Sequence, residues 1–307
     1  MNIGIIGIGD IAKKAYLPLI TRIKNLELHI FTRNTKVLDD ISEQYRIKNI
    51  YSNLSELLDN RLDAVFLHSS TNSHAYIIEQ CLINKIPVFV DKPISYDFNE
   101  SSRLVDVSES KQCPMIVGFN RRFVPAYQKV NLVQQKDLIV MQKNRRNSSQ
   151  NVRLVIYDDF IHVVDTLRYL VSDQVTNMMV HGNVKDNILH YVMLQLISKK
   201  TIAIGIMHRN TGLMEEQLDI TSEDEKWSVR DLSEITHYKE VATSSTKNIW
   251  LSHLETLGFN QMIQDFLMII KNYQEDPVPI FKSASSRLHN ALISHQICEK
   301  IINDLLI

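Results

Sequence analysis

The residues with the most specific chemical pattern form a short stretch from Gly7 to Ala12, which reads Gly-Ile-Gly-Asp-Ile-Ala. It lies between an apolar run at 2–7 and a segment, 10–24, with helical spacing. In a G-x-G-x-x-A turn the glycines allow a sharp bend and a close approach to a pyrophosphate, which the helix N-terminus also binds. We therefore predict a turn that binds NAD(H) or NADP(H), rather than a tight turn with chance glycines. The motif residues expected at the cofactor are Gly7, Gly9, Asp10 and Ile11.

The end of the second expected strand, 27–32, distinguishes between the two cofactors. An NAD site usually has an acid about 20 residues after the motif, where it binds the ribose hydroxyls. Here Thr32 is followed by Arg33, and a guanidinium binds a 2′-phosphate through two parallel charged hydrogen bonds. We therefore favour NADP over NAD, with an exposed loop arginine as the alternative.

A lysine follows another expected strand, 87–90. Asp91-Lys92-Pro93 comes directly after this strand, at the carboxyl edge where ligands of parallel sheets bind. Lys92 is suited to binding a substrate hydroxyl or to stabilising negative charge on its oxygen. A surface lysine before a turn proline explains the pattern equally well.

A histidine on an expected helix, 158–171, is the second group suited to proton transfer. Asp158, His162 and Asp165 stand at i, i+4 and i+7 and would share one face of an α-helix. Imidazole exchanges protons near neutral pH, and a carboxylate one turn away can orient it. The same spacing also describes an ordinary pair on a helix surface.

The elements that must position these residues alternate between strands and helices up to Gly118. This alternation predicts a doubly wound parallel sheet of the Rossmann type. The expected strands are 2–7, 27–32, 63–68, 87–90 and 114–118, and the helices are 10–24, 36–46, 54–59, 73–84 and 97–111.

After Gly118 a helix, a strand at 138–145 and the helix 158–171 come first, and successive strands follow from 175 to 241. Without helices between them, these strands must pair as an antiparallel meander, so we predict an α+β domain with a large, mainly antiparallel open sheet. We place an NAD(P)-binding domain at 1–120 and a substrate-binding and oligomerisation domain at 121–307. Its expected strands are 138–145, 175–182, 187–198, 201–209, 215–221, 226–231 and 234–241, and its helices are 124–134, 158–171, 252–273 and 285–305.

Composition restricts the remaining possibilities. The 34 Lys and Arg residues nearly balance the 35 Asp and Glu residues, so we expect no nucleic-acid or membrane partner. No signal peptide pattern opens the chain, and no apolar run approaches the ~18 residues of a membrane span. The three cysteines and the histidines lack the spacing of metal ligands or a disulfide framework. We expect a cytoplasmic protein without a metal site.

Several of these residues together resemble the Gfo/Idh/MocA family of oxidoreductases, and most closely its MviM-like branch. The resemblance includes the N-terminal glycine motif, Asp-Lys-Pro-Ile at 91–94, Gly-Phe-Asn-Arg-Arg-Phe at 118–123 and the Asp-x-x-Ile-His-x-x-Asp helix at 158–165. It implies that Lys92, Asp158 and His162 surround the substrate carbon that faces C4 of the nicotinamide. It also implies a homodimer or homotetramer, in which the open sheet of one copy packs on a partner.

The resemblance adds cofactor contacts and shows where this chain departs from the family. Asp91 replaces the usual Glu, and Ser69-Ser70 stands where many members have Thr-Pro. His74 is a cofactor candidate, although a histidine at a helix N-terminus is more often structural. The further residues expected at the cofactor are Thr32, Arg33, Ser69, Ser70, His74, Asp91, Lys92, Asn120 and Arg121.

The expected activity is hydride transfer between a nicotinamide and the secondary alcohol or ketone of a sugar, polyol or related small molecule. In this reaction His162 exchanges the hydroxyl proton, Lys92 polarises the oxygen and Asp158 orients the histidine or the lysine. One alternative is a non-catalytic sensor of nucleotide or sugar with the same fold. Another is a reductase of a diol, imine or tetrapyrrole substrate.

Overall fold

The computed structural model describes residues 1–245 and 251–306. The chain divides into two compact units, and each contains two segments of the sequence. The first unit comprises 1–118 and 260–293, and the second comprises 119–259 and the C-terminal residues from 294. The predicted domain boundary at residue 120 lies close to residue 118, where the first segment of the first unit ends. The prediction did not include 260–293 in the first unit. Residues 246–250 and 307, which fall within the predicted second domain, lie outside the described residues.

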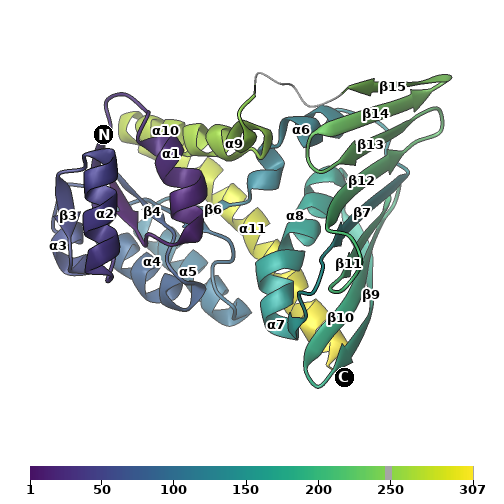
Figure 1. Cartoon of the computed structure of the whole chain (residues 1–307), viewed down its shortest axis with the longest axis horizontal. Helices are drawn as coiled ribbons and strands as arrows, with labels where there is room; N and C mark the ends of the chain where they lie inside the picture. The colour runs from purple at the N-terminus through teal and green to yellow at the C-terminus, as the bar shows by residue number, and fades with distance from the viewer. Residues whose placement is uncertain (246–250, 307) are drawn as a thin grey trace. The chain divides into compact units, whose positions relative to one another are not determined.

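The first unit contains a six-stranded, fully parallel sheet with the order β3-β2-β1-β4-β5-β6, as Figure 1 shows. The predicted doubly wound sheet is confirmed. The strand order reverses between β1 and β4, which is the point where ligands bind in such sheets. The sequence pattern missed β3 because this edge strand has only three residues, none of them buried. The strands are β1 Asn2–Ile6, β2 Glu27–Phe31, β3 Asn49–Tyr51, β4 Ala64–Leu67, β5 Val88–Asp91 and β6 Met115–Gly118.

The helices of the first unit begin at polar caps in several places. Asn34 caps α2 by accepting a hydrogen bond from the Val37 backbone at 3.1 Å, and Asp97 caps α5 through Glu100 at 2.9 Å. The expected helix 10–24 is shorter and begins with a π-helical turn. The elements are η1 Ala12–Tyr16, α1 Leu17–Ile20, α2 Thr35–Tyr45, α3 Leu54–Leu58, η2 Thr71–Ser73, α4 His74–Ile83 and α5 Phe98–Lys111.

Two C-terminal helices contribute to the core of the first unit. α10 (Phe259–Glu275) places Phe266 against Phe66 and Phe89, with ring centroids 5.0 and 5.4 Å apart. α11 (Pro277–Leu305) adds Leu288 to the cluster under the sheet. α11 begins earlier than the expected 285, because prolines at the start of a helix remove only N–H groups that have no partner there.

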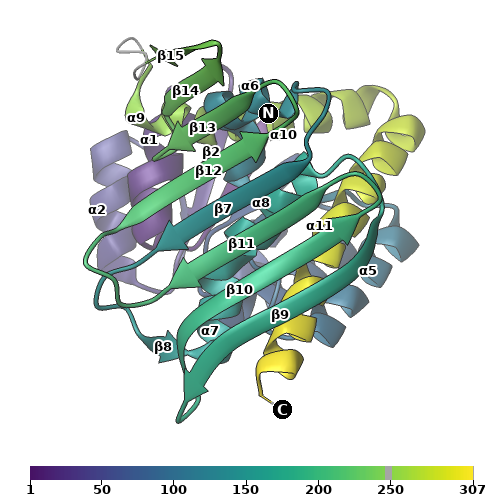
Figure 2. The same cartoon turned by 90° about the vertical axis from the view of Figure 1, so that its right-hand side faces the viewer.

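The second unit is built on a nine-stranded mixed sheet, seen face-on in Figure 2. A mostly antiparallel sheet was predicted and is confirmed, but the expected meander of the strands from 175 to 241 is interrupted between β11 and β12. β7 lies between β12 and β11 and runs parallel to β11, because helical elements separate it from the later strands. The strands are β7 Leu138–Asn144, β8 Gln150–Asn151, β9 Val175–Lys185, β10 Ile188–Ser198, β11 Ile202–His208, β12 Glu215–Thr221, β13 Lys226–Arg230, β14 Glu234–Lys239 and β15 Val241–Ser245.

One face of this sheet packs on a helical segment, 152–170, which contains nearly all of the expected helix 158–171. A Cβ on Gly205 would lie 2.6 Å from a methyl group of Val163, which shows how closely β11 approaches α8. No helix in the described residues is long and apolar enough to cross a membrane. The helical elements of the second unit are η3 Asn120–Phe123, α6 Pro125–Asn131, α7 Val152–Val155, η4 Ile156–Phe160, α8 Ile161–Leu170 and α9 His253–Thr256.

Candidate functional site

A pocket of about 450 Å³ lies at the carboxyl edge of the parallel sheet. It is formed by the glycine turn after β1, the end of β2 and the loop after β4. Six of the predicted cofactor residues line it, namely Gly7, Gly9, Thr32, Arg33, Ser69 and Ser70. The structure therefore brings together, within one unit, residues that the sequence separates by more than sixty positions.

The glycine turn is shaped for close contact. Gly7 has a φ of +85°, and a Cβ on it would lie 2.5 Å from the backbone of Ser69. Its N–H donates to the Phe31 carbonyl at 2.9 Å, which fixes the turn to the adjacent strand. The small residue of the motif, Ala12, is fully buried. These contacts fit the backbone cradle that a dinucleotide pyrophosphate requires.

Not every residue of the motif contributes a side chain to the pocket. The Asp10 carboxylate pairs with Lys14 at 2.8 Å and is largely exposed, and Ile11 is 41% exposed. Neither is among the residues that line the pocket. The motif thus acts through its backbone and its glycines.

His74 lies behind the loop that carries the two serines. Its buried ring places Nδ1 2.9 Å from the Pro93 carbonyl and Nε2 3.0 Å from the Ser69 carbonyl. Burial lowers the pKa of His74, whereas the Pro93 and Ser69 carbonyls, which can only accept hydrogen bonds, oppose this shift. The ring connects the loop after β4 to the loop after β5, and it does not line the pocket.

Asp91 belongs to a buried cluster that sequence reasoning missed. Its carboxylate accepts a hydrogen bond from Tyr16 at 2.5 Å and contacts Nδ1 of His68 at 2.7 Å. The His68 ring packs on Tyr16 with centroids 3.8 Å apart and also lines the cofactor pocket. Burial opposes the charge of Asp91, but His68 and the Tyr16 hydroxyl lower its pKa. Half-buried Lys92 is the next residue in the chain.

The second unit holds the predicted histidine beside an arginine that helix spacing did not indicate. Asp158 lies in a π-helical turn, η4, and His162 follows at the start of α8. Nδ1 of His162 lies 3.1 Å from a guanidinium nitrogen of Arg121. Asp165 is buried and binds Arg122 through both oxygens at 2.6 and 2.8 Å. We therefore assign Asp165 to an ion pair within the fold.

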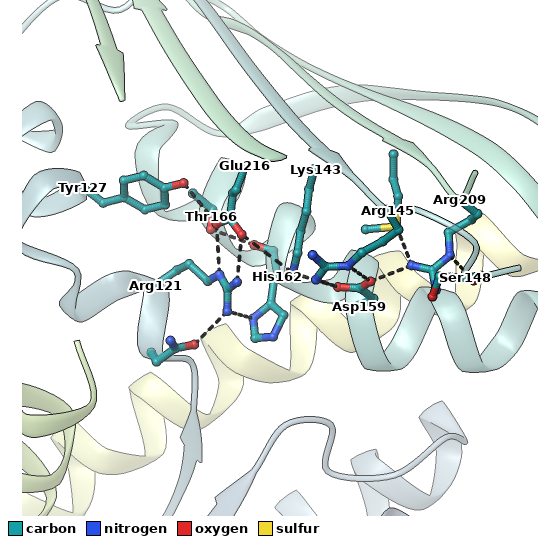
Figure 3. A network of polar contacts seen from close by, with 12 residues as sticks. Arg121, Tyr127, Lys143, Arg145, Ser148, Asp159, His162, Thr166, Arg209 and Glu216 are labelled. Carbon is teal, nitrogen blue, oxygen red and sulfur yellow. Dashed lines mark hydrogen bonds and ion pairs between the residues drawn. The ribbon is translucent and has the colours of Figure 1, made fainter. Parts of the chain in front are cut away.

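Arg121 connects His162 to a larger polar network, drawn in Figure 3. Arg121 donates to both oxygens of Glu216 at 2.8 and 3.2 Å, and to the Asn120 side chain at 3.1 Å. Tyr127 donates to the same Glu216 at 3.1 Å. Burial opposes the charge of Glu216, but Arg121 and Lys143 lower its pKa to about 2.

The other half of the network surrounds Asp159, the neighbour of the predicted Asp158. Its carboxylate binds Lys143 at 2.8 Å, Arg145 at 2.7 and 2.8 Å, and Arg209 at 2.6 Å. Burial and the charge of Arg121 lower the pKa of Lys143 to about 7. Strand alternation could have indicated Lys143, since it shares the buried face of β7 with Ile139 and Met141.

The comparisons with known proteins agree with this architecture. Residues 1–119 match the oxidoreductase family with an NAD-binding Rossmann fold, and 125–240 match the YceM-like C-terminal domain. The chain is 29% identical to a protein of Salmonella typhimurium named as the oxidoreductase YceM, over 89% of this chain and 90% of that protein.

Two further relatives have been named as dehydrogenases. The crystal structure of a dehydrogenase (MviM) from Clostridium difficile has a TM-score of 0.91 and 29% identity over 99% of each chain. A myo-inositol 2-dehydrogenase of Thermotoga maritima is 26% identical over 60% of this chain and 59% of that protein.

Proposed function

Because this chain belongs to the Gfo/Idh/MocA family of oxidoreductases, with an NAD-binding Rossmann domain, we propose that it is an NAD(P)-dependent dehydrogenase or reductase. Its substrate is a secondary alcohol or ketone of a sugar, polyol or related small molecule. The pocket lined by the glycine turn, Thr32 and Arg33 is the observation that carries this proposal. The name of the relative from Thermotoga maritima supports the polyol class.

NADP is the proposed cofactor. Thr32 and Arg33 line the pocket at the end of β2, where an NAD enzyme would usually place an acid on the ribose. A hydroxyl and a guanidinium suit a 2′-phosphate better than a free ribose hydroxyl.

The chain's own residues would bind the substrate oxygen and handle its proton. The bound cofactor would supply hydride transfer at C4 of its nicotinamide. Lys92, at the carboxyl edge of β5, would polarise the substrate oxygen, and Asp158 would orient the lysine or the histidine, as the family resemblance implies.

The hydrogen bond on His162 limits how this residue would act. A guanidinium has donors only, so Nδ1 of His162 accepts from Arg121 and the neutral ring holds its proton on Nε2. In this state His162 would donate a hydrogen bond to a substrate carbonyl, but delivering the proton that reduction requires needs a ring protonated at both nitrogens, so Nδ1 would first have to leave Arg121. For oxidation of an alcohol, Nε2 must accept a proton, so the Arg121 contact would have to be released in this direction as well.

A second copy of the chain is the proposed partner. The sheet face turned toward the viewer in Figure 2 carries no helix of the second unit in its described residues. Gly205 faces α8, so strand alternation places Val140, Ile204 and Ile206 on the opposite face, where they are half-buried. A partner would cover these apolar groups.

The cytoplasm is the proposed location. Three buried free cysteines, Cys81, Cys113 and Cys298, are consistent with a reducing compartment.

The direct test is a turnover assay on the purified full-length protein. Sugars, polyols and their ketones are supplied with NADP(H) and separately with NAD(H), and nicotinamide absorbance is followed. We expect turnover of at least one substrate with a preference for NADP(H). Tight cofactor binding without turnover on the whole panel would instead favour a nucleotide sensor.

A further inference from the structure

We propose that the substrate carries an oxyanion, either a carboxylate or a phosphate, which binds to a cation cluster in the second unit. We define the cation cluster as Arg121, Lys143, Arg145 and Arg209. This inference rests on the proposed function, since it names the substrate class of the same site. The four residues of the cation cluster are drawn in the network of Figure 3.

The cation cluster has more positive groups than its partners can neutralise. Asp159 alone is shared by Lys143, Arg145 and Arg209, and Glu216 pairs with Arg121. Four cations therefore share two carboxylates within this network. The side chains of Lys143 and Arg209 are only 1% and 3% exposed, and burial of unbalanced charge is costly.

The protonation state of Lys143 reflects this excess of cations over carboxylates. Glu216 on β12 and Asp159 on η4 favour its charged form, whereas burial, Arg121 on η3 and Arg145 after β7 disfavour it. The balance leaves its pKa at about 7, far below that of an ordinary lysine. An added oxyanion would restore the charged form and compensate the surplus charge.

The parts of the network that remain accessible are suited to such a ligand. The side chain of Arg145 is 25% exposed and that of Arg121 is 13% exposed. A guanidinium binds carboxylate or phosphate oxygens through paired hydrogen bonds, and Arg145 donates to Asp159 only through Nε and one terminal nitrogen, which leaves its other edge for such a pair. Arg121 already donates through all three of its nitrogens and would add a single hydrogen bond. Because Arg121 also contacts His162, an anion bound to Arg121 would lie beside the histidine proposed to act on the substrate oxygen.

A purely structural network would have no preference for anions, so binding by the intact protein separates the two cases. With NADP bound, calorimetry compares D-gluconate with sorbitol, and D-glucose 6-phosphate with D-glucose. Inorganic phosphate and acetate serve as general probes. We expect the anionic member of at least one pair to bind about tenfold or more tightly, as for hydrogen bonds to charged groups. The two pairs distinguish a carboxylate from a phosphate.

Two variants test whether the preference for anionic ligands depends on the cation cluster. Arg145→Gln removes one accessible cation, and Arg146→Gln changes the exposed neighbouring arginine as the matched control. We expect Arg145→Gln to abolish most of the preference for the anion and Arg146→Gln to retain it. Equal binding of neutral and anionic members by the wild type, or no binding of any anion including inorganic phosphate, overturns the proposal.

Proton uptake gives a readout that does not depend on Arg145→Gln folding. At a pH of about 8, above the pKa of Lys143, anion binding should draw a proton onto this lysine. Calorimetry in two buffers of different ionisation enthalpy detects that proton, and Lys143→Met should abolish its uptake. Anion binding without proton uptake by the wild type contradicts the part assigned to Lys143.

The outcomes also separate this inference from the proposed function. Hydride transfer to neutral substrates only, with no effect of anions, would overturn the oxyanion site and leave the dehydrogenase proposal standing. Anion binding at the cation cluster without hydride transfer to any substrate of the panel would support the site and contradict the enzymatic proposal.

Discussion

Arg33 is the single residue on which the proposed cofactor preference depends. Its side chain lines the pocket beside Thr32, at the end of β2. A phosphate bound by a guanidinium loses charged hydrogen bonds when the arginine is removed, whereas a free ribose hydroxyl loses little. The preference can therefore be tested without knowing the substrate.

We predict that Arg33→Ala weakens NADPH binding by about 10- to 100-fold and changes NADH binding little. Fluorescence titration of both cofactors measures the difference. Arg103→Ala, at an exposed arginine of α5, is the control and should leave both affinities unchanged. An equal loss for NADPH and NADH would show that Arg33 does not recognise the 2′-phosphate.

His162 is the residue whose loss should separate catalysis from cofactor binding. We expect His162→Ala to lower kcat/KM by about 10²- to 10⁴-fold while the cofactor Kd stays near that of the wild type. His253→Ala, an exposed histidine on α9, is the matched control. Turnover of His162→Ala at the wild-type rate would exclude the proposed role of His162.

Among the elements, the β1-to-helix turn has the strictest backbone requirement. Gly7 combines a φ of +85° with the approach of the Ser69 backbone, so a side chain there meets both strain and a clash. The loop after β4 cannot move away freely, because His74 holds the Ser69 carbonyl. This element should therefore tolerate alanine poorly.

Gly7→Ala should lower the free energy of unfolding by at least about 1–3 kcal/mol and should abolish cofactor binding. Urea unfolding and cofactor titration measure the two effects. Gly212→Ala is the matched control, since a Cβ at that position would meet nothing within 4 Å. If Gly7→Ala binds cofactor normally, the turn does not cradle the phosphates.

The ion pair between Arg121 on η3 and Glu216 on β12 should make the free energy of unfolding depend on pH. The pKa of Glu216 is lowered in the folded state to about 2. Its stabilisation is therefore present above the ordinary glutamate pKa and is lost as pH falls toward 2. A pKa lowered to this extent corresponds to a stabilisation on the order of 3 kcal/mol near neutral pH.

Glu216→Gln should accordingly destabilise the protein at neutral pH and much less at a pH of about 2. Denaturant unfolding across this range measures the difference, with exposed Glu223→Gln as the control. A destabilisation that does not change with pH would mean that the Glu216 charge contributes nothing to the fold.

At the scale of the whole molecule, the open sheet face of the second unit determines the expected assembly. β7 and β11 present Val140, Ile204 and Ile206 on the face opposite the buried Ala203 and Met207. A cluster of partly exposed apolar side chains of this kind favours association.

We predict that Ile204→Lys shifts the protein toward monomer. Light scattering coupled to size-exclusion chromatography measures the mass, and Leu213→Lys, in the exposed loop after β11, is the control. A wild-type monomer at all accessible concentrations, or an Ile204→Lys variant with the wild-type mass, would contradict assembly through this face.

The amino-acid sequence by itself determined the parallel sheet, the glycine turn and the positions of Arg33 and Lys92 at the carboxyl ends of strands. These features are local, because a short segment sets its own periodicity, turn and cap. The sequence did not indicate that β7 runs parallel to β11, or that Phe266 joins the core beside Phe66.

Only the tertiary structure decided the setting of His162. Its partner Arg121 comes from 41 residues earlier, and Glu216 lies a further 95 residues beyond Arg121. Pairing between such distant charges depends on sheet order and on burial, neither of which residue spacing records. Residue spacing likewise did not indicate Asp159, whose carboxylate binds three cations.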